Sequence, residues 1–457
     1  MSNLRTLNRR EFMRFFAAGA AGLGLGGCHG GITKGALEQQ HQPNIVFIIA
    51  DDLGWRDIGY NGSEIQTPNL DRLAKEGRVF DQHYVMPTCT PTRVGLLSGR
   101  YPSRFGVLSP AYGKIYDDDT LTLPEALKRS GYTTHISGKW HMGSPPEFTP
   151  MKYGFTSSYG YFAGQIDPYT HHYKTGEKSW HRNDNYLDET GHATDLITKD
   201  AVRVIKSRHT QPFFLYIAYS VPHFPLKEPE KWLAMYPKIK EESRRWFAAS
   251  VTHMDEGIGR IVNALDQTGL RKDTLLVFVS DNGGQKSWHS DTEYNGRYAR
   301  LPHTVLGNNL PLRGWKGDCY EGGVRVPGFV NWPQTISAGK IEAPVHIVDW
   351  MPTLCHLACF EPKHSLQWDG QDIWPIITGE RAQVSERILY WKTPGASAVR
   401  KGDWKLIISR KNGHSELFNL MNDPYEKSDL ADQESKRVSE LQALLKQIAS
   451  RDRERIS

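Results

Sequence analysis

Seven residues, 44–50, constrain the fold of this chain more than any other stretch. After Asn44 they read Ile-Val-Phe-Ile-Ile-Ala, with no polar residue at alternate positions. A strand with one solvent-exposed face alternates polar and apolar side chains, whereas a strand buried on both faces does not. The run therefore predicts a central strand of a parallel sheet with helices on both sides. It leads directly into Asp51 and Asp52.

Strand and helix patterns alternate along the following chain, as expected for an α/β fold. Turn-bounded apolar runs predict strands at 133–137, 212–219 and 274–280, and apolar periodicity predicts helices at 192–208 and 244–266. We therefore predict a large doubly wound, mixed sheet flanked by helices.

The pattern changes after about residue 371. Short strands are predicted at 388–391, 398–400, 404–409 and 416–419, followed by an amphipathic helix at 435–448. This order indicates a smaller C-terminal α+β subdomain with an antiparallel sheet. We divide the chain into an export signal at 1–28, a linker at 29–42, a main domain at 43–370 and this subdomain at 371–457.

The N-terminus is typical of an export signal. Residues 8–13 (Asn-Arg-Arg-Glu-Phe-Met) precede a Gly-rich apolar run, as in twin-arginine signals, and the run is too short to span a membrane. Residues 25–28 (Leu-Gly-Gly-Cys) resemble a lipobox, in which Cys28 would carry a lipid. The alternative is a cleaved signal and a soluble periplasmic protein. We expect an exported bacterial protein, periplasmic or anchored to the membrane by lipid.

Charge and cysteine content argue against two broad classes of protein. The formal net charge of +5 is a mild excess that suits an anionic ligand but does not indicate nucleic-acid binding. The five cysteines imply no disulfide framework.

Carboxylates follow two of the predicted strands. Asp51 and Asp52 come directly after 44–50, and Asp281 and Asn282 directly after 274–280. Ligands bind outside the carboxyl ends of strands in such sheets, so these side chains are expected to meet there. Their mutual repulsion calls for a cation, and oxygen ligands favour Ca²⁺ or Mg²⁺. The alternative is that these residues only form turns after the strands, since Asp and Asn favour turns. This alternative explains either pair alone, but it explains the presence of both pairs less well.

Cationic and imidazole side chains follow the other strands. Lys139 and His141 come after 133–137, and His223 comes after 212–219. Lys316 lies in a long loop without periodicity, from which it could reach an anionic ligand. A lone His at a strand end is usually structural. Here several strand ends deliver charged or acid–base groups to one edge, which indicates a functional site.

A second long segment, 142–188, also lacks periodicity. Two interpretations stay open: a polar substrate rim, or insertion loops with incidental aromatic side chains. The residues concerned are Tyr159, Tyr161, Tyr169, His171, His172, Tyr173, Trp180 and His181.

Cys89 stands at the start of a predicted helix. Pro91 suits the first helical turn, and the free N–H groups at a helix N-terminus favour anions. The position can activate a nucleophile or receive an oxyanion.

The pattern Cys89-x-Pro91-x-Arg93 resembles the signature of the type I sulfatases, in which the cysteine is oxidised to formylglycine. The resemblance extends over about residues 44–422, and within the family the arrangement resembles N-acetylgalactosamine-4-sulfatase and its bacterial relatives. It implies the fold of the alkaline phosphatase superfamily. The other matching motifs, in order, are Asp51-Asp52, Gly138-Lys139-Trp140-His141, His223, Asp281-Asn282-Gly283-Gly284 and Lys316.

The resemblance also implies roles for these residues. Hydrated formylglycine at position 89 would attack sulfur, and His141 would act as the base that expels sulfate. A formylglycine-generating enzyme would modify the cysteine during maturation. The implied Ca²⁺ ligands are Asp51, Asp52, Asp281, Asn282 and the modified Cys89. The implied catalytic residues also include Arg93 and Lys139, which would stabilise the hydrate. His223 and Lys316 would face the sulfate. The full implied catalytic set is Cys89, Arg93, Lys139, His141, His223 and Lys316.

We therefore predict a Ca²⁺-dependent hydrolase of sulfate esters, acting on a galacto-configured sulfated carbohydrate. Two alternatives stay open. One is a phosphate or phosphonate ester hydrolase on the same fold, and the other is a surface protein that binds sulfated glycans without turnover.

Overall fold

The computed structural model describes residues 42–111, 113–288, 292–298, 304–382 and 387–456. The predicted export signal lies outside these residues. From Gln42 onward the chain forms one unit, and the domain boundary proposed after residue 370 stays a prediction. Within the described part of the chain, none of the helices combines the length and apolar character that a membrane span requires.

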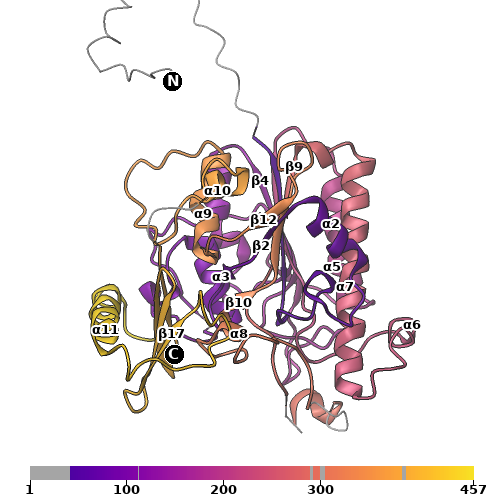
Figure 1. Cartoon of the computed structure of the whole chain (residues 1–457). Coiled ribbons are helices and arrows are strands. Elements are labelled where there is room, and N and C mark those ends of the chain that lie inside the picture. Colours follow the sequence, from indigo (N-terminus) through magenta and orange to yellow (C-terminus); the bar gives the residue numbers. More distant parts are fainter. Residues whose placement is uncertain (1–41, 112, 289–291, 299–303, 383–386, 457) are drawn as a thin grey trace, which may run out of the picture. The chain divides into compact units, whose positions relative to one another are not determined.

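A ten-stranded mixed sheet forms the centre of this unit, as predicted (Figure 1). The five strands β9-β1-β8-β4-β5 are parallel neighbours, and shorter strands lie at both edges. In spatial order the strands are β12 (Gly339–Ile341), β2 (Arg78–Phe80), β11 (Gly328–Asn331), β9 (Thr274–Ser280), β1 (Asn44–Ala50), β8 (Phe213–Ala218), β4 (Thr133–Lys139), β5 (Ser157–Tyr161), β6 (Trp180–Arg182) and β7 (Asn185–Tyr186). Every residue of β1 is buried, which confirms its predicted central place.

Alternate residues of β1 face two separate hydrophobic cores. Val46 and Ile48 belong to the core beneath α2, α5 and α7, whereas Ile45, Phe47 and Ile49 belong to the core beneath α3, α4 and α9. Figure 1 shows α2, α5 and α7 grouped on one side of the sheet, with α3 and α9 on the other. These helices are α2 (Pro68–Glu76), α3 (Cys89–Ser98), α4 (Leu123–Arg129), α5 (Ala193–Lys206), α7 (Glu242–Gln267) and α9 (Trp350–Leu357).

The C-terminal region forms the predicted antiparallel sheet. Its strands β14 (Ile388–Lys392), β15 (Ala396–Lys401), β16 (Trp404–Ser409) and β17 (Ser415–Asn419) pair in chain order. One face packs on α11 (Ser435–Ala449), where Leu406 and Leu417 meet Leu441. The other face contributes Trp391 and Phe418 to the core of the main sheet. The subdomain is therefore joined to the main sheet by a shared apolar interior.

Short elements complete the described chain. A three-stranded sheet consists of β10 (Arg325–Val326), β3 (His83–Tyr84) and β13 (Val345–His346). The remaining short α-helices are α6 (Glu230–Leu233), α8 (Glu321–Val324) and α10 (Trp374–Thr378). Turns of 3₁₀-helix occur at Gly59–Asn61, Pro102–Phe105, Pro150–Tyr153, Arg271–Asp273, Glu293–Gly296 and Ile347–Asp349.

The expectation that segment 142–188 lacks regular structure is wrong. It contains β5, β6 and β7, which extend the main sheet. Tyr159, Tyr161, Trp180 and His181 are buried there, so these side chains are part of the interior and not of a substrate rim. The strands escaped detection because each is only two to five residues long, too short for an alternating pattern to register.

Candidate active site

The parallel strands deliver the predicted site residues to one edge of the sheet. Asp51 and Asp52 follow β1, and Asp281 and Asn282 follow β9, the neighbouring strand. The Asp281 N–H donates to the Ala50 carbonyl at 3.0 Å, so the pairing of the two strands continues up to the carboxylates. This edge is the ligand-binding edge of an open α/β sheet.

Three buried carboxylates meet at this edge. Asp51, Asp52 and Asp281 are at most 1% exposed. Asp52 has a φ of 70°, a left-handed conformation that is uncommon for any residue other than glycine. Its N–H donates to Asp281 Oδ1 at 3.2 Å. The surrounding structure therefore holds Asp52 in a strained conformation, as is common at functional sites.

Each carboxylate has its own cation. Because an uncompensated buried charge is costly, three carboxylates can be buried together only with such partners. The pairs are Lys139 Nζ with Asp51 at 2.6 Å, Arg93 Nη2 with Asp281 at 2.9 Å, and Lys316 Nζ with Asp52 at 2.7 Å. The formal charges of these six side chains sum to zero, so a bound divalent cation would leave the site positive toward an anionic substrate.

Cys89 is the first residue of α3 and lies inside the cluster. Its Sγ lies 3.2 Å from Nδ1 of His141, and it is 2% exposed. Burial raises the pKa of the thiol, although Lys139 and Lys316 act in the opposite direction. Burial therefore works against the activated thiolate that was one interpretation of the sequence.

The imidazole of His141 is held from several sides. His141 has a φ of 60°, and its N–H donates to the Phe162 carbonyl at 3.0 Å. A Cβ on Gly164 would lie 2.3 Å from His141 Nε2. A larger residue than glycine at position 164 would therefore displace this ring.

His223 and Lys316 form the more open side of the site. Their side chains are 11% and 16% exposed, whereas Arg93 and Lys139 are fully buried. His223 Nδ1–H donates to the Phe224 carbonyl, so Nε2 faces the site, 3.8 Å from Asp52 Oδ2. A substrate would therefore approach past these two side chains.

Two buried oxygens at this edge suit a metal ion. Asp51 Oδ1 and Asn282 Oδ1 accept no hydrogen bond from any residue that the structure describes. The Asn282 amide donates to Asp52 Oδ1 at 2.8 Å, which turns its oxygen away from that carboxylate. Burial, together with Asp281 and Asp52, raises the pKa of Asp51 to about 8 against the influence of Lys139. A hard cation with oxygen ligands, such as Ca²⁺, fits this donor set.

Comparison with known proteins decides the family. A family model described as sulfatase matches residues 43–359, and a model described as N-sulphoglucosamine sulphohydrolase, C-terminal, matches residues 315–454. The chain belongs to the sulfatase family. It is a sulfuric ester hydrolase, as the resemblance in the sequence implied.

Sulfatases of animals and bacteria are similar over most of this chain. Arylsulfatase J of Mus musculus is 34% identical, over 85% of this chain and 73% of its own length. N-acetylgalactosamine-6-O-sulfatase of Bacteroides thetaiotaomicron is 29% identical, over 93% of this chain and 97% of its own length. The crystal structure of Ps i-CgsB in complex with k-i-k-neocarrahexaose has a TM-score of 0.80 and 31% identity, over 90% of this chain and 94% of that one.

The sulfatase structure brings all ten sequence-predicted site residues into one connected cluster. Sequence reasoning missed two supporting residues. The hydroxyl of Tyr216, on β8, lies 3.2 Å from Arg93 Nη1, but in the sequence Tyr216 is one more apolar residue of a buried strand. Gly164 gave no signal because its role depends on the position of His141.

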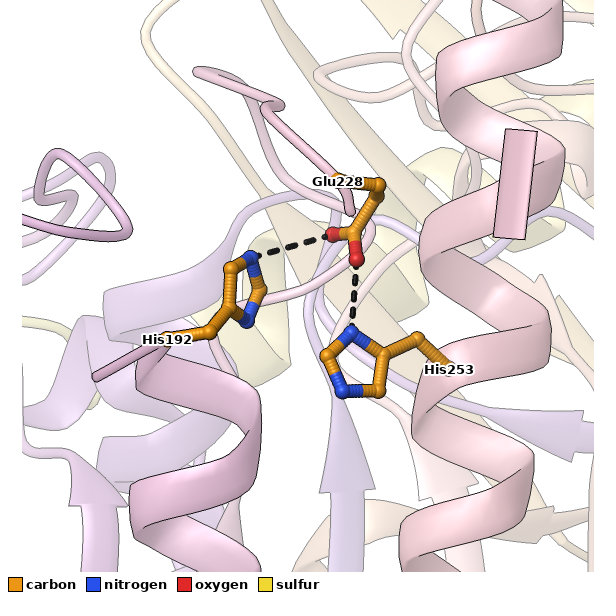
Figure 2. Close-up of side chains that lie close together, drawn as sticks. All are labelled: His192, Glu228 and His253. Atoms are coloured by element: carbon orange, nitrogen blue, oxygen red, sulfur yellow. Dashed lines mark hydrogen bonds and ion pairs between the residues drawn. The ribbon is translucent and has the colours of Figure 1, made fainter. Parts of the chain in front are cut away.

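A second cluster of possible metal ligands consists of His192, Glu228 and His253 (Figure 2). His192 lies at the start of α5, Glu228 in the loop after β8, and His253 on α7. Thr194 N–H donates to His192 Nδ1 at 3.2 Å, so the proton of this ring is on Nε2. A metal bound at Nε2 would require the proton on Nδ1, where it would face that N–H. This tautomer argues against a metal.

A proton on His253 explains the second cluster better. Its Nδ1 lies 2.6 Å from Glu228 Oε2, and its Nε2 lies 3.4 Å from Asp195 Oδ2. Burial disfavours the imidazolium, but Asp195 and Glu228 outweigh it and raise the pKa of His253 to about 9. Burial keeps the neighbouring His192 neutral by lowering its pKa, and Arg260 shares Asp195. His253 therefore ties α7 to α5 and to the loop that carries His223.

This account predicts a specific pH dependence of stability. Folding raises the pKa of His253 from 6.5 to about 9, so protonation of His253 stabilises the folded state. This stabilisation is complete below pH 6.5 and is lost as the pH rises through 9. We expect the advantage of wild type over His253→Gln in urea unfolding to shrink by about 3 kcal/mol across that range. A constant advantage, or one that a chelator removes, would contradict the protonated form.

Proposed function

We propose that this sulfatase hydrolyses sulfate esters of a galacto-configured carbohydrate with a nucleophile derived from Cys89. The observation that carries the proposal is the position of Cys89 Sγ among the buried carboxylates and cations, within reach of His141. Two relatives support the substrate class, since one is named for N-acetylgalactosamine-6-O-sulfate hydrolysis and another was crystallised with a neocarrahexaose.

Formylglycine at position 89 would supply the nucleophile, since its hydrated aldehyde offers one hydroxyl for attack and a second for release. His141 Nδ1 lies where it can take a proton from a group on the Cys89 side chain. Arg93 and Lys139 are fully buried in ion pairs with Asp281 and Asp51 and would place positive charge near the developing oxyanion. These three residues would therefore act on the nucleophile and not on the sugar.

Ca²⁺ would be held by Asp51, Asp52, Asp281, Asn282 and the modified Cys89. When bound, it would polarise the sulfate and lower the pKa of the nucleophile. Asn282 would contribute its side-chain oxygen. Because the Asn282 amide N–H donates to Asp52, this oxygen already points away from the Asp52 carboxylate. Lys139 and Arg93 would compensate the remaining carboxylate charge.

Lys316 and His223 would contact the sulfate ester and its leaving group. Both lie beside Asp52 on the more open side of the site. Asp52 and the other acidic neighbours raise the pKa of Lys316 even though its burial opposes this, so the ammonium is present for a sulfate oxygen. His223 presents Nε2 to the same space. The leaving alcohol would depart toward this opening.

Maturation of Cys89 must precede folding. Every residue of α3, including Cys89, Pro91 and Arg93, is buried. A formylglycine-generating enzyme could therefore read the Cys-x-Pro-x-Arg pattern only on an unfolded chain. We further propose that residues 1–28 export the protein to the periplasm or anchor it to the membrane through Cys28.

The first prediction of the proposed function concerns Cys89 itself. Cys89→Ala is expected to abolish sulfate release from sulfated galactose or N-acetylgalactosamine saccharides. Cys355→Ala removes another buried cysteine, on α9, and should keep turnover close to wild type. In active wild type, peptide mass spectrometry should find an aldehyde in place of the thiol. Unchanged hydrolysis by Cys89→Ala would overturn the mechanism, and faster hydrolysis of the matching phosphate esters would favour the phosphatase alternative.

The second prediction concerns the metal. Exhaustive chelation is expected to remove activity, and Ca²⁺ is expected to restore it. Calorimetry on Asp51→Asn should show Ca²⁺ affinity reduced by about tenfold or more, since one charged oxygen ligand is lost. Asp432→Asn, which changes an exposed carboxylate of the C-terminal region, serves as the control. Full activity after chelation would disprove the metal assignment.

The third prediction concerns export. Replacing Arg9 and Arg10 with Lys should retain the protein in the cytoplasm. Cys28→Ser should move the exported protein from the membrane fraction to the soluble periplasm if Cys28 carries the lipid. Release of wild type in soluble form would support the cleaved signal instead.

A further inference from the structure

The C-terminal sheet contributes one fully buried ammonium group to the region behind the active site. Lys405, on β16, lies 2.8 Å from Glu321 Oε1 and 2.9 Å from Glu426 Oε1, and all three side chains are completely buried. Glu321 is the first residue of α8, only five residues after Lys316. Glu426 lies in the turn that follows β17. Lys405 therefore joins two segments that are far from it in sequence.

The ammonium is what allows two carboxylates to be buried side by side. Glu321 N–H also donates to Glu426 Oε2 at 2.6 Å, and the Tyr84 hydroxyl donates to Glu321 Oε2 at 2.7 Å. Burial opposes the charge on Lys405, but Glu321 and Glu426 outweigh it and raise its pKa. Removal of one partner from such a group leaves an uncompensated buried charge, which is far more costly than loss of a surface pair.

Glu426 is itself held in an unusual conformation. Its φ is 55°, in the left-handed region that bulky residues avoid. Its carbonyl accepts from Arg313 Nη1 at 3.1 Å, so Glu426 contacts both α8 and the loop before Lys316. These contacts hold Glu426 in its strained conformation. They also fix the position of Glu426 relative to α8.

Helix α8 packs directly against the proposed metal-binding loop. Gly283, the residue after Asn282, donates its N–H to the Gly323 carbonyl at 3.0 Å. A Cβ on Gly283 would lie 1.8 Å from the Gly322 carbonyl oxygen. The two backbones are therefore in close contact, and a shift of α8 would move the backbone beside Asn282.

The segment with Lys316 is tied to the same helix. Gly322 N–H donates to the Arg313 carbonyl at 2.7 Å, and Lys316 N–H donates to the Gly284 carbonyl at 3.2 Å. Gly317 N–H donates to the Pro87 carbonyl at 2.8 Å, next to the turn that leads into Cys89. Backbone hydrogen bonds thus connect α8 with the loops that carry the nucleophile, a metal ligand and the substrate-facing lysine.

We propose that Lys405 is a positioning residue, which holds α8 against the active-site loops and so sets the places of Asn282 and Lys316. The C-terminal subdomain is then a working part of the active site, although its sheet provides no group to the reacting atoms. The expected effect of Lys405 on catalysis rests on the proposed function, whereas its effect on the positions of Asn282 and Lys316 does not.

The test compares Lys405→Met with Lys392→Met. Lys392 lies in the same sheet and pairs with Asp452 at 2.8 Å, so its loss weakens the same subdomain without touching α8. In hydrogen–deuterium exchange of the full chain, Lys405→Met should speed exchange at least tenfold in peptides covering 282–284 and 316–324. Lys392→Met should leave these peptides at wild-type rates.

Function provides a second readout. At saturating Ca²⁺, Lys405→Met should lower kcat/KM about tenfold or more per folded molecule, and its Ca²⁺ affinity should fall by a similar factor. Lys392→Met should change neither. If wild type itself shows no Ca²⁺ binding or sulfatase turnover, the proposed function fails, and the exchange rates still decide the positioning.

Should Lys405→Met fail to fold, the double variant Lys405→Met/Glu426→Met takes its place. It replaces a buried ion pair with apolar side chains, a change that proteins often tolerate, and it leaves Glu321 beside Arg325 at 3.7 Å. The same loop peptides should exchange faster in this variant. Wild-type exchange in these loops, in either folded variant, would overturn the proposal, as would equal acceleration in Lys392→Met.

Discussion

The burial of three carboxylates at one edge of the sheet is the constraint on which the active site depends. Asp51, Asp52 and Asp281 lie close together because β1 and β9 are adjacent and parallel. Such a group is stable only if opposite charge is brought to it, since a buried charge without a partner costs several kcal/mol. The rest of the site can be understood as the means of supplying that charge.

The compensating charges come from distant parts of the chain. Arg93 is on α3, Lys139 ends β4, and Lys316 lies in the loop after β9. Each is positioned by a rigid element or by close backbone contacts, so the charges do not have to be ordered when substrate binds. Preorganised charge of this kind is the main source of electrostatic catalysis. The buried network around Lys405 extends the same principle to the loops themselves.

The sequence was most informative where one side chain pattern had one structural meaning. Residues 44–50 and 274–280 became β1 and β9 with the predicted bounds, because a strand buried on both faces has a continuous apolar sequence. Polar residues directly after such strands predicted the cluster of carboxylates and cations that the structure shows at this edge of the sheet. Tyr159 and Trp180 were ambiguous because strands as short as β5 and β6 have no detectable period. Tyr216 and Lys405 were not recognised because their importance depends on contacts far away in sequence.

A crystal structure of the mature protein with Ca²⁺ tests the central claim most directly. Anomalous scattering should place one calcium ion in contact with Asp51 Oδ1 and Asn282 Oδ1, two buried oxygens of this edge that accept no hydrogen bond from the described residues. The side chain at position 89 should be a ligand of the same ion. Hydrogen bonds from water or protein to both oxygens, with no calcium peak between the carboxylates, would contradict the account.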